Sequence, residues 1–412
     1  MTAPVRRRLD QIDAMRPIKQ AGVVSTHALM YFAPAVATLG SGAAQLLLHV
    51  SREGFFFISA CMLAYAYADL RLADLAGLRR YYWRRFLAVG VPYLCWTLIY
   101  FLFMLPTAHY SGLASALRGL ALMAATGYFQ LYFLLVIMQF YLVFPLLIIV
   151  LRRTRGHPGL VLAATLIAQL AISIATQSHS LPRLMQDQNQ LDALSYLLYL
   201  IGGCIVALHL EQVDAWVRGH ARLIVMLTVV AAFAAEGLYF LGQYGVTSAL
   251  GSGYRALAVG YSAFLPSVIP FNVGAIACGY LAGVVLVRPG RSRATKAAVQ
   301  AGVDDTYGIY LSHMLVLTML TWLGWKDLNS VLPWPLLCLL TVGIVIACCV
   351  PLTALLARTP LATPLTGRRR VPWHKTSSRR PEPAGFPAAA SQGRTLIATP
   401  GSAAVPAETA AG

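Results

Sequence analysis

The sequence is poor in charged residues, and its cysteines lack the spacing that binds metals. Only 11% of its 412 residues are charged, whereas soluble domains carry about 25%. A soluble fold needs polar side chains to cover its surface, so this composition excludes an ordinary soluble protein. The seven cysteines all lie in apolar stretches and none is spaced C-x-x-C, so we expect them to pack as small hydrophobic residues, with no metal or disulfide role. A Gly-rich nucleotide-binding loop is also missing, which argues against an ATP-driven pump.

Long apolar runs take the place of the missing charge. Hydrophobic residues make up 58% of the chain, and the mean hydropathy is +0.65. The eighth of the runs contains Pro266 and Pro270 and is too long for one straight span, so we expect it to be kinked or partly re-entrant. The sequence predicts an all-α fold, a polytopic membrane helix bundle of about ten transmembrane helices. A bilayer core needs about 20 apolar residues per helix, and the runs that meet this need are 17–40, 43–68, 86–105, 128–150, 158–176, 191–210, 221–242, 256–287, 306–325 and 331–357.

The basic residues follow a pattern that alternates from loop to loop. The chain has 32 Lys and Arg residues against 15 Asp and Glu, and most of the basic ones lie in the N-terminal arm, in the loops after even-numbered runs and in the C-terminal tail. The alternate loops hold only Arg118, Arg183, Arg255 and Lys326. Because basic residues are retained on the cytoplasmic side during insertion, both termini are expected to be cytoplasmic. This topology accounts for the net charge of +17 without a nucleic-acid partner.

The apolar pattern stops near Arg358. The residues that follow are rich in Pro, Ala, Gly, Ser and Arg, with almost no large hydrophobic side chains. Such a segment cannot bury enough apolar surface to become ordered. The sequence therefore predicts a membrane-embedded domain over residues 1–357 and a basic, disordered cytoplasmic tail over residues 358–412.

One histidine lies deep inside the first apolar run. An ionisable residue in a span is costly, so it is a functional candidate by default. His27 lies about ten residues into the run, near mid-bilayer at 1.5 Å per residue. Arg16 precedes it by eleven residues, which places both side chains on one helix face about 16 Å apart, although Pro17 favours a position for Arg16 at the helix start. This geometry suits a substrate with an anionic head at the cytoplasmic mouth and a reactive end halfway down, which is the shape of acyl-coenzyme A.

The segment that holds these two residues resembles the opening of acyltransferase family 3, in which an Arg, ten residues and a His begin the first helix. The family consists of membrane enzymes that O-acylate surface polysaccharides, lipid-linked glycans and related acceptors. Residues 53–59 (EGFFFIS) resemble the second-helix block of the family, residues 80–84 (RYYWR) its cytoplasmic Arg-x-x-x-Arg, and residues 305–313 (DTYGIYLSH) a block late in the chain. The resemblance extends from residue 9 to about 357.

The sequence departs from the family pattern at three positions. Ala60 replaces the usual Gly, and Gln130 and Tyr132 stand where many members have His and Trp. Together with Tyr141 and Pro145, the segment 129–133 looks closer to the subgroup that modifies secreted exopolysaccharide. The departures therefore leave the class of acceptor open, whereas the expected fold is unchanged.

The resemblance implies roles for individual residues. His27 would be the general base that acts on an acceptor hydroxyl; the alternative is a hydrogen-bonded packing histidine. Glu53 would either orient His27 or the acceptor, or only neutralise its neighbour Arg52. Arg16, Arg80 and Arg84 would hold the phosphates of coenzyme A, although positive-inside topology alone also explains the last two. Further candidates from the same blocks are Asp13, Ser59, Tyr310 and His313, the last as a second polar contact or as a structural residue.

Together these features predict a plasma-membrane, multi-pass O-acyltransferase. It would move an acyl group, with acetyl as first choice, from cytoplasmic acyl-coenzyme A to a hydroxyl of an extracytoplasmic or lipid-linked glycan. Its partners would be the lipid bilayer, acyl-coenzyme A as donor substrate and the glycan acceptor, with no permanently bound cofactor. A polysaccharide or lipid-linked sugar transporter without acyl-transfer chemistry is the alternative, because polar intramembrane residues suit it too. A third alternative is a receptor or scaffold, which would tolerate substitutions at both Arg16 and His27.

Overall fold

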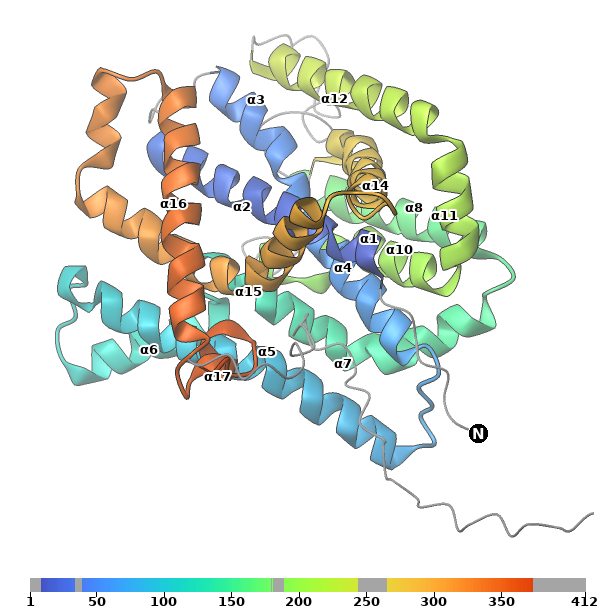
Figure 1. Cartoon of the computed structure of the whole chain (residues 1–412), viewed down its shortest axis with the longest axis horizontal. Helices are drawn as coiled ribbons and strands as arrows, with labels where there is room; N and C mark the ends of the chain where they lie inside the picture. Colours follow the sequence, from blue (N-terminus) through green and yellow to red (C-terminus); the bar gives the residue numbers. More distant parts are fainter. Residues whose placement is uncertain (1–8, 34–38, 179, 181–188, 244–264, 373–412) are drawn as a thin grey trace, which may run out of the picture.

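The protein is an α-helical bundle. The computed structural model describes residues 9–33, 39–178, 180, 189–243 and 265–372, and this part of the chain is 85% helical and contains no strand (Figure 1). The main helices are α1 (Asp10–Asp13), α2 (Met15–Phe32), α3 (Leu39–Leu48), α4 (Val50–Tyr67), α5 (Leu75–Met104), α6 (Leu113–Thr126), α7 (Tyr132–Arg153), α8 (Pro158–Gln177), α10 (Leu197–Leu208), α11 (Leu210–Gly219), α12 (Ala221–Gln243), α14 (Ile269–Leu286), α15 (Arg293–Trp322), α16 (Trp334–Leu356) and α17 (Ala362–Thr366).

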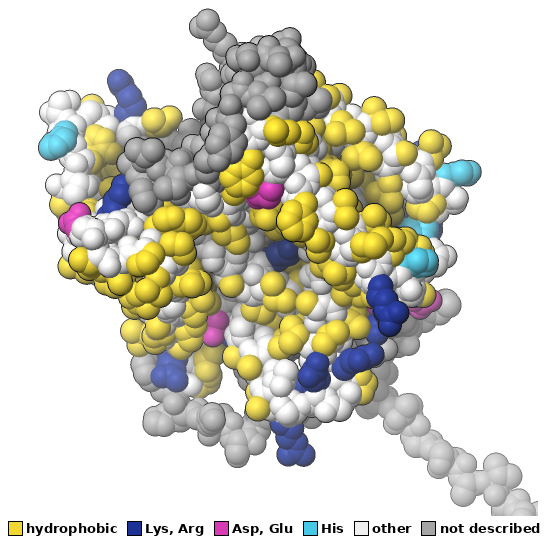
Figure 2. All heavy atoms as spheres, turned by 90° about the horizontal axis from the view of Figure 1, so that it is seen from above, with side chains coloured by type: hydrophobic (Ala, Val, Ile, Leu, Met, Phe, Trp, Pro, Cys, Tyr) yellow, Lys and Arg dark blue, Asp and Glu magenta, His cyan; other side chains and the backbone are white. Residues whose placement is uncertain are grey.

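Most of these helices have membrane character. Among the described residues, seven helical segments are long and apolar enough to cross a bilayer: Gly40–Tyr67, Leu75–Thr107, Phe129–Arg153, Pro158–Gln177, Ala221–Gly242, Pro266–Leu286 and Trp334–Leu356. An eighth candidate is the pair formed by Ala193–Leu208 and Leu210–Gly219, which is bent by 101°. Figure 2 shows hydrophobic side chains spread over one face of the molecule, with Lys and Arg mostly towards the lower part of the view. The expected polytopic helix bundle is confirmed.

The remaining two expected spans correspond to α2 and α15. Both are continuous helices, of 18 and 30 residues, but polar residues such as Arg16, Lys19 and Asp305 reduce their apolar character. The count of ten spans and the cytoplasmic position of the termini therefore stay predictions. Residues 113–126 form α6, a helix of 14 residues without a single buried side chain, which is too short to span a bilayer.

The polar helix α2 lies inside the bundle, where it packs against α4, α14, α15 and α16 (Figure 1). Its polar side chains therefore face protein instead of lipid, which is how membrane proteins accommodate ionisable groups. By contrast, α8 and α12 expose most of their apolar residues at the outside of the bundle. The enclosed position of α2 is what places its polar residues beside other helices.

Helices α4 and α10 pack closely along each other. Small residues allow this approach: a Cβ atom on Gly203 would lie only 2.4 Å from the carbonyl oxygen of Phe57 and 3.1 Å from the Cβ of Ala60. Lipid tails are as apolar as the side chains, so the hydrophobic effect does not drive helices together inside a bilayer. Close packing through small residues is therefore a main source of helix association. This contact holds α4, with Arg52 and Glu53, in its place next to α2.

The two prolines of the eighth apolar run do not kink a helix within the described residues 265–287. Pro266 begins a short 3-10 helix, Pro266–Val268, and Pro270 lies in the first turn of α14. The missing N–H of proline costs nothing in a first turn. The part of the expected run from 256 to 264 lies outside the described residues.

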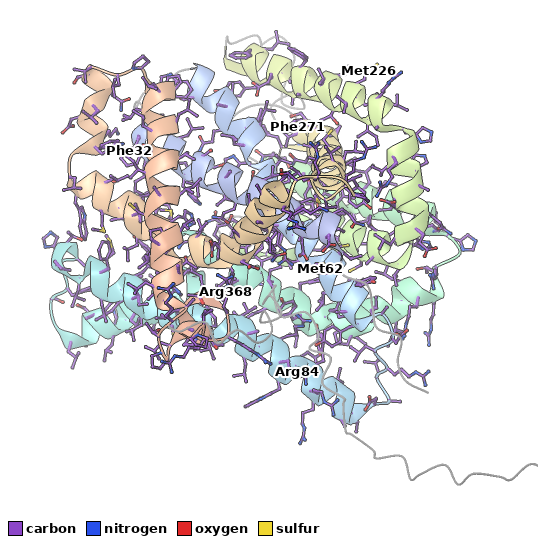
Figure 3. The ribbon with its side chains drawn as sticks, viewed as in Figure 1. Phe32, Met62, Arg84, Met226, Phe271 and Arg368 are labelled. Atoms are coloured by element: carbon purple, nitrogen blue, oxygen red, sulfur yellow. The ribbon has the colours of Figure 1, made fainter. Side chains whose placement is uncertain are left out.

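The chain stays packed on the bundle beyond residue 357, where the membrane domain was expected to end. Helix α17 lies against α5, α15 and α16, and the indole of Trp96 donates a hydrogen bond to the carbonyl oxygen of Leu365 at 3.0 Å. Arg368 forms ion pairs with Asp304 at 3.2 Å and Asp305 at 2.8 Å (Figure 3). The packed chain reaches Pro372, and the remainder of the expected tail, 373–412, lies outside the described residues.

Candidate active site

A cavity of about 540 Å³ lies between α2, α4, α7 and α15. Ligand sites for small molecules typically enclose about 300–1,000 Å³, so this volume fits a reacting group together with part of its acceptor. The wall mixes aromatic and polar side chains. It includes His27, His49, Arg52, Phe129, Gln130, Tyr132, Tyr307 and Tyr310.

His27 reaches this cavity from α2. Its ring centroid lies 5.2 Å from that of His313 and 6.1 Å from that of Phe129. The Nδ1 atom is buried and has no hydrogen-bond partner among the described residues. A packing histidine normally has its ring nitrogens paired, because a buried polar atom without a partner is costly. The geometry therefore favours the functional interpretation of His27.

His313 lies on α15, fully buried behind His27. Its Nδ1 is 2.8 Å from the carbonyl oxygen of Tyr310 and 3.1 Å from that of Ile309. Carbonyl oxygens only accept, so Nδ1 carries the proton and Nε2 carries the lone pair. That Nε2 atom has no partner in the described part of the chain. Folding thus brings two histidines from opposite ends of the sequence into ring contact.

Glu53 is buried and forms an ion pair with its neighbour Arg52. One of its oxygens lies 2.6 Å from Nη2 and 3.1 Å from Nε of Arg52, and it also attracts the buried ammonium group of Lys19. Arg52 in turn donates to the hydroxyl of Tyr132 at 3.5 Å and lies 5.0 Å from the ring centroid of Tyr196. No hydrogen bond joins Glu53 to His27 in the described structure. Of the two expected roles for Glu53, the pair with Arg52 is the one with a visible contact.

The other candidates on α1, α2 and α4 lie away from the cavity wall. Asp13 and Arg16 are both buried and form an ion pair of 3.2 Å at the start of α2, with Pro17 in the first turn as expected. Ser59 is buried on α4, and its hydroxyl has no hydrogen-bond partner within the described residues. Tyr310 does line the cavity, and its hydroxyl donates to the backbone oxygen of Gln130.

Arg80 and Arg84 are both exposed on α5, and Figure 3 shows Arg84 pointing away from the bundle. They line a second cavity of about 510 Å³ together with Tyr67, Arg71 and Tyr81. The two cavities share no residue. The structure therefore does not bring Arg80 and Arg84 to His27, and any role for them concerns a distant part of a substrate.

A family model described as an acyltransferase domain matches residues 9–353. The chain belongs to acyltransferase family 3. The match includes every sequence block noted above, from Asp13 to His313, and confirms the resemblance. No curated protein and no solved structure matches the chain.

For a membrane acyltransferase, the structure adds a basic residue that the sequence analysis passed over. Arg85 is only 4% exposed, and its guanidinium lies 4.8 Å over the ring centroid of Tyr67. The helical period could have revealed it, because Tyr81, Arg85 and Val89 are spaced by four on the buried face of α5, whereas Arg84 lies on the other face. The motif Arg-x-x-x-Arg therefore points outwards, and the adjacent arginine points inwards.

The structure also explains Gln130, one of the departures from the family pattern. Its side-chain nitrogen donates to the hydroxyl of Tyr100 at 2.8 Å and to the carbonyl oxygen of Leu311 at 3.4 Å. These bonds attach the turn before α7 to α5 and α15. Gln130 thus has a positioning role at the cavity that no short-range pattern in the sequence indicates.

Proposed function

We propose that this protein is an O-acyltransferase of the plasma membrane that moves an acyl group, acetyl as first choice, from cytoplasmic acyl-coenzyme A to a hydroxyl of an extracytoplasmic or lipid-linked glycan. The observation that carries the proposal is His27, which lines the 540 Å³ cavity and whose Nδ1 has no hydrogen-bond partner among the described residues. Membership of an acyltransferase family supports the reaction class.

The reaction needs a base beside the acceptor hydroxyl. In this proposal a ring nitrogen of neutral His27 takes the hydroxyl proton while the oxygen attacks the thioester carbonyl carbon. The carbon–sulfur bond then breaks, and the leaving thiolate takes the proton from the imidazolium, which returns His27 to its neutral form. The products are an ester and free coenzyme A. The neutral ring of His313, whose centroid lies 5.2 Å from that of His27, would lie beside the positive charge that forms on His27.

The donor would enter from the side of the basic residues on α5. Arg80 and Arg84 at the second cavity, with Arg16 and the buried Arg85 further in, offer guanidinium groups that match phosphate geometry. The long flexible arm of the donor would then carry the thioester from this cavity towards His27. Because the thioester of acyl-coenzyme A lies at the tip of a long arm, one donor molecule could occupy both cavities.

Arg52 and Glu53 would shape the acceptor side. Arg52 lines the cavity and keeps its charge there because Glu53 balances it in a buried pair. Glu53 is then a positioning residue for Arg52, and Arg52 is a donor for acceptor oxygens. Ser59 and Asp13 have no contact with the cavity and are assigned no step.

The test is acyl transfer from labelled acetyl-coenzyme A to the glycan fraction in membranes that carry the full-length protein. We expect His27→Ala to lower the rate at least about a hundredfold, the contribution typical of a general base, at unchanged expression. His109→Ala is the matched control, because His109 is exposed and does not line the cavity. Activity of His27→Ala within about twofold of the control would refute the mechanism.

Two further outcomes separate the proposal from transport without chemistry. An acyltransferase consumes the labelled donor and adds the mass of the acyl group to a glycan, which mass spectrometry of wild-type and deletion strains identifies. A transporter would leave acetyl-coenzyme A unused and would change only the location of the glycan.

A further inference from the structure

Phe129 has an unusual backbone conformation at the cavity. Its φ of 47° is the one positive value that a non-glycine residue adopts in the described part of the chain. Residues other than Gly, Asn and Asp rarely adopt this left-handed backbone conformation, and a bulky residue there is strained. Such strain persists only where the surroundings impose it, and it gathers at binding and catalytic sites.

The surroundings of Phe129 hold this conformation from both sides. Before it, Gly127 has a φ of 71°, and a Cβ atom there would lie 2.5 Å from both the nitrogen and the Cα of Tyr132. After it, Gln130 is tied by its side chain to Tyr100 and by its backbone oxygen to Tyr310. The turn between α6 and α7 therefore presents the Phe129 ring in one fixed place.

That place is next to His27, with part of the ring uncovered. The ring centroid lies 6.1 Å from that of His27, 5.5 Å from that of Tyr31 and 5.6 Å from that of Tyr128. The residue lines the cavity and is 37% exposed. An apolar ring that is held at a strained backbone position and still leaves part of its surface open to a cavity can contact a ligand there.

A second observation concerns the polar side of the same cavity. Gln130 is 2% exposed and lines the cavity, and its side-chain oxygen has no hydrogen-bond partner among the described residues. A buried acceptor without a donor is costly unless a ligand supplies one. Arg52 offers donors on the same wall. A ligand that combines an apolar face with hydrogen-bonding groups at its edge would satisfy both sides of the cavity.

We infer that Phe129 is the acceptor platform of this enzyme, on which one face of a pyranose ring packs so that a ring hydroxyl lies before His27. The C–H bonds on that face carry partial positive charge and meet the negative face of the aromatic ring. The sugar hydroxyls can donate to Gln130 and accept from Arg52. An alkyl chain would fill the cavity but leave the oxygen of Gln130 without a donor. The role of this platform in acyl transfer rests on the proposed function, whereas the binding of a sugar to Phe129 does not.

Binding can be tested without chemistry, by saturation-transfer NMR on the full-length protein in phosphatidylcholine nanodiscs, which contain no sugar headgroups. The probes are methyl pyranosides of glucose, galactose, mannose, rhamnose and N-acetylglucosamine, with linear sorbitol as control ligand. We expect transfer from aromatic protons to the C–H protons of one sugar face in wild type, in Phe129→Tyr and in His27→Ala. Phe129→Asn should lose it, because Asn tolerates the left-handed backbone but has no ring.

A kinetic and a stability measurement complete the test. With the pyranoside that binds as acceptor, Phe129→Asn should raise the acceptor KM about tenfold, the loss expected for one aromatic contact, and leave the KM for acetyl-coenzyme A within about twofold. Its thermal midpoint should equal or exceed that of wild type, because the substitution relieves backbone strain. A residue with a purely structural role would instead lower the thermal midpoint.

The outcomes distinguish this inference from the proposed function. Pyranoside binding that disappears in Phe129→Asn supports the platform even if no acyl transfer is detected. Acyl transfer to glycans with equal pyranoside binding in wild type and Phe129→Asn overturns the platform and leaves the proposed function intact. Binding of linear sorbitol in place of all pyranosides would also overturn it.

Discussion

The ion pair of Arg52 and Glu53 allows a quantitative test of why an acidic residue stands inside the membrane. Glu53 is 1% exposed and lies 2.6 Å from the guanidinium of Arg52. Removing one partner of a buried pair leaves an uncompensated charge and costs about 3–5 kcal/mol. Glu53→Gln keeps the shape and one acceptor oxygen, so we expect a loss of about 3 kcal/mol in the free energy of unfolding.

The double variant shows whether the cost arises from the pair. Replacing a buried pair by uncharged groups of similar volume is often nearly neutral, so Arg52→Met with Glu53→Gln should recover about 2 kcal/mol relative to the sum of the single variants. The assay is equilibrium unfolding in lipid bicelles for wild type, both single variants and the double variant. Lys19, which Glu53 also attracts, keeps part of the cost in the double variant.

The turnover of folded molecules then decides between the two roles of Glu53. If Glu53 only balances cations, Glu53→Gln lowers the amount of folded protein, and each folded molecule keeps acyl-transfer activity within about tenfold of wild type. Unfolding free energies that agree within about 0.5 kcal/mol across all four proteins would refute the reasoning about the pair. A loss of about a thousandfold per folded molecule at unchanged stability would place Glu53 in the chemistry.

Three further predictions concern packing, the donor and the C-terminal segment. Gly203→Ala should lower the free energy of unfolding by about 1–3 kcal/mol through overpacking, whereas Gly202→Ala should not, because nothing lies within 4 Å of its added Cβ. Equal unfolding of the two variants in bicelles would contradict this. Arg84→Ala should raise the KM for acetyl-coenzyme A a few-fold, and more at low salt, whereas Arg79→Ala should not, because Arg79 lies outside the second cavity. Equal KM values would remove Arg84 from the donor site. Arg368→Ala should lower the free energy of unfolding by about 1–2 kcal/mol, because Asp304 and Asp305 lose a partly buried partner, and Arg368→Lys should have a smaller effect. Limited proteolysis after α17 should become faster in Arg368→Ala, and an unchanged rate would show that the segment is held by α17 alone.

The sequence predicted that this is a membrane protein, and it predicted the order of the family motifs along the chain. Seven of the ten apolar runs coincide with helices, in the described part of the chain, that are long and apolar enough to cross a bilayer, because lipid demands about 20 apolar residues for every span, whatever their neighbours. His27 became a candidate in the same way, as an ionisable group deep inside an apolar run. Membership of acyltransferase family 3 followed from short blocks around Arg16, Glu53, Arg80 and His313, and the family match confirms it.

The faces of the helices were predicted less well. The Arg-x-x-x-Arg motif drew attention to Arg80 and Arg84, which are exposed, while Arg85 carries the buried guanidinium. A motif records which residues occur together, whereas burial depends on the angle at which α5 meets its neighbours. Counting by the helical period from Tyr81 would have corrected this, since residues four apart share a face.

The sequence by itself determined that the chain is a membrane helix bundle, which residues are titratable inside it and to which family it belongs. These properties depend on local composition and on the transfer of side chains from water to lipid, so they can be read along the chain. Only the tertiary structure decided that His27 lies against His313 and that Phe129 is held with a positive φ. Contacts between distant helices and a strained turn depend on how the whole bundle packs, and no local pattern encodes them.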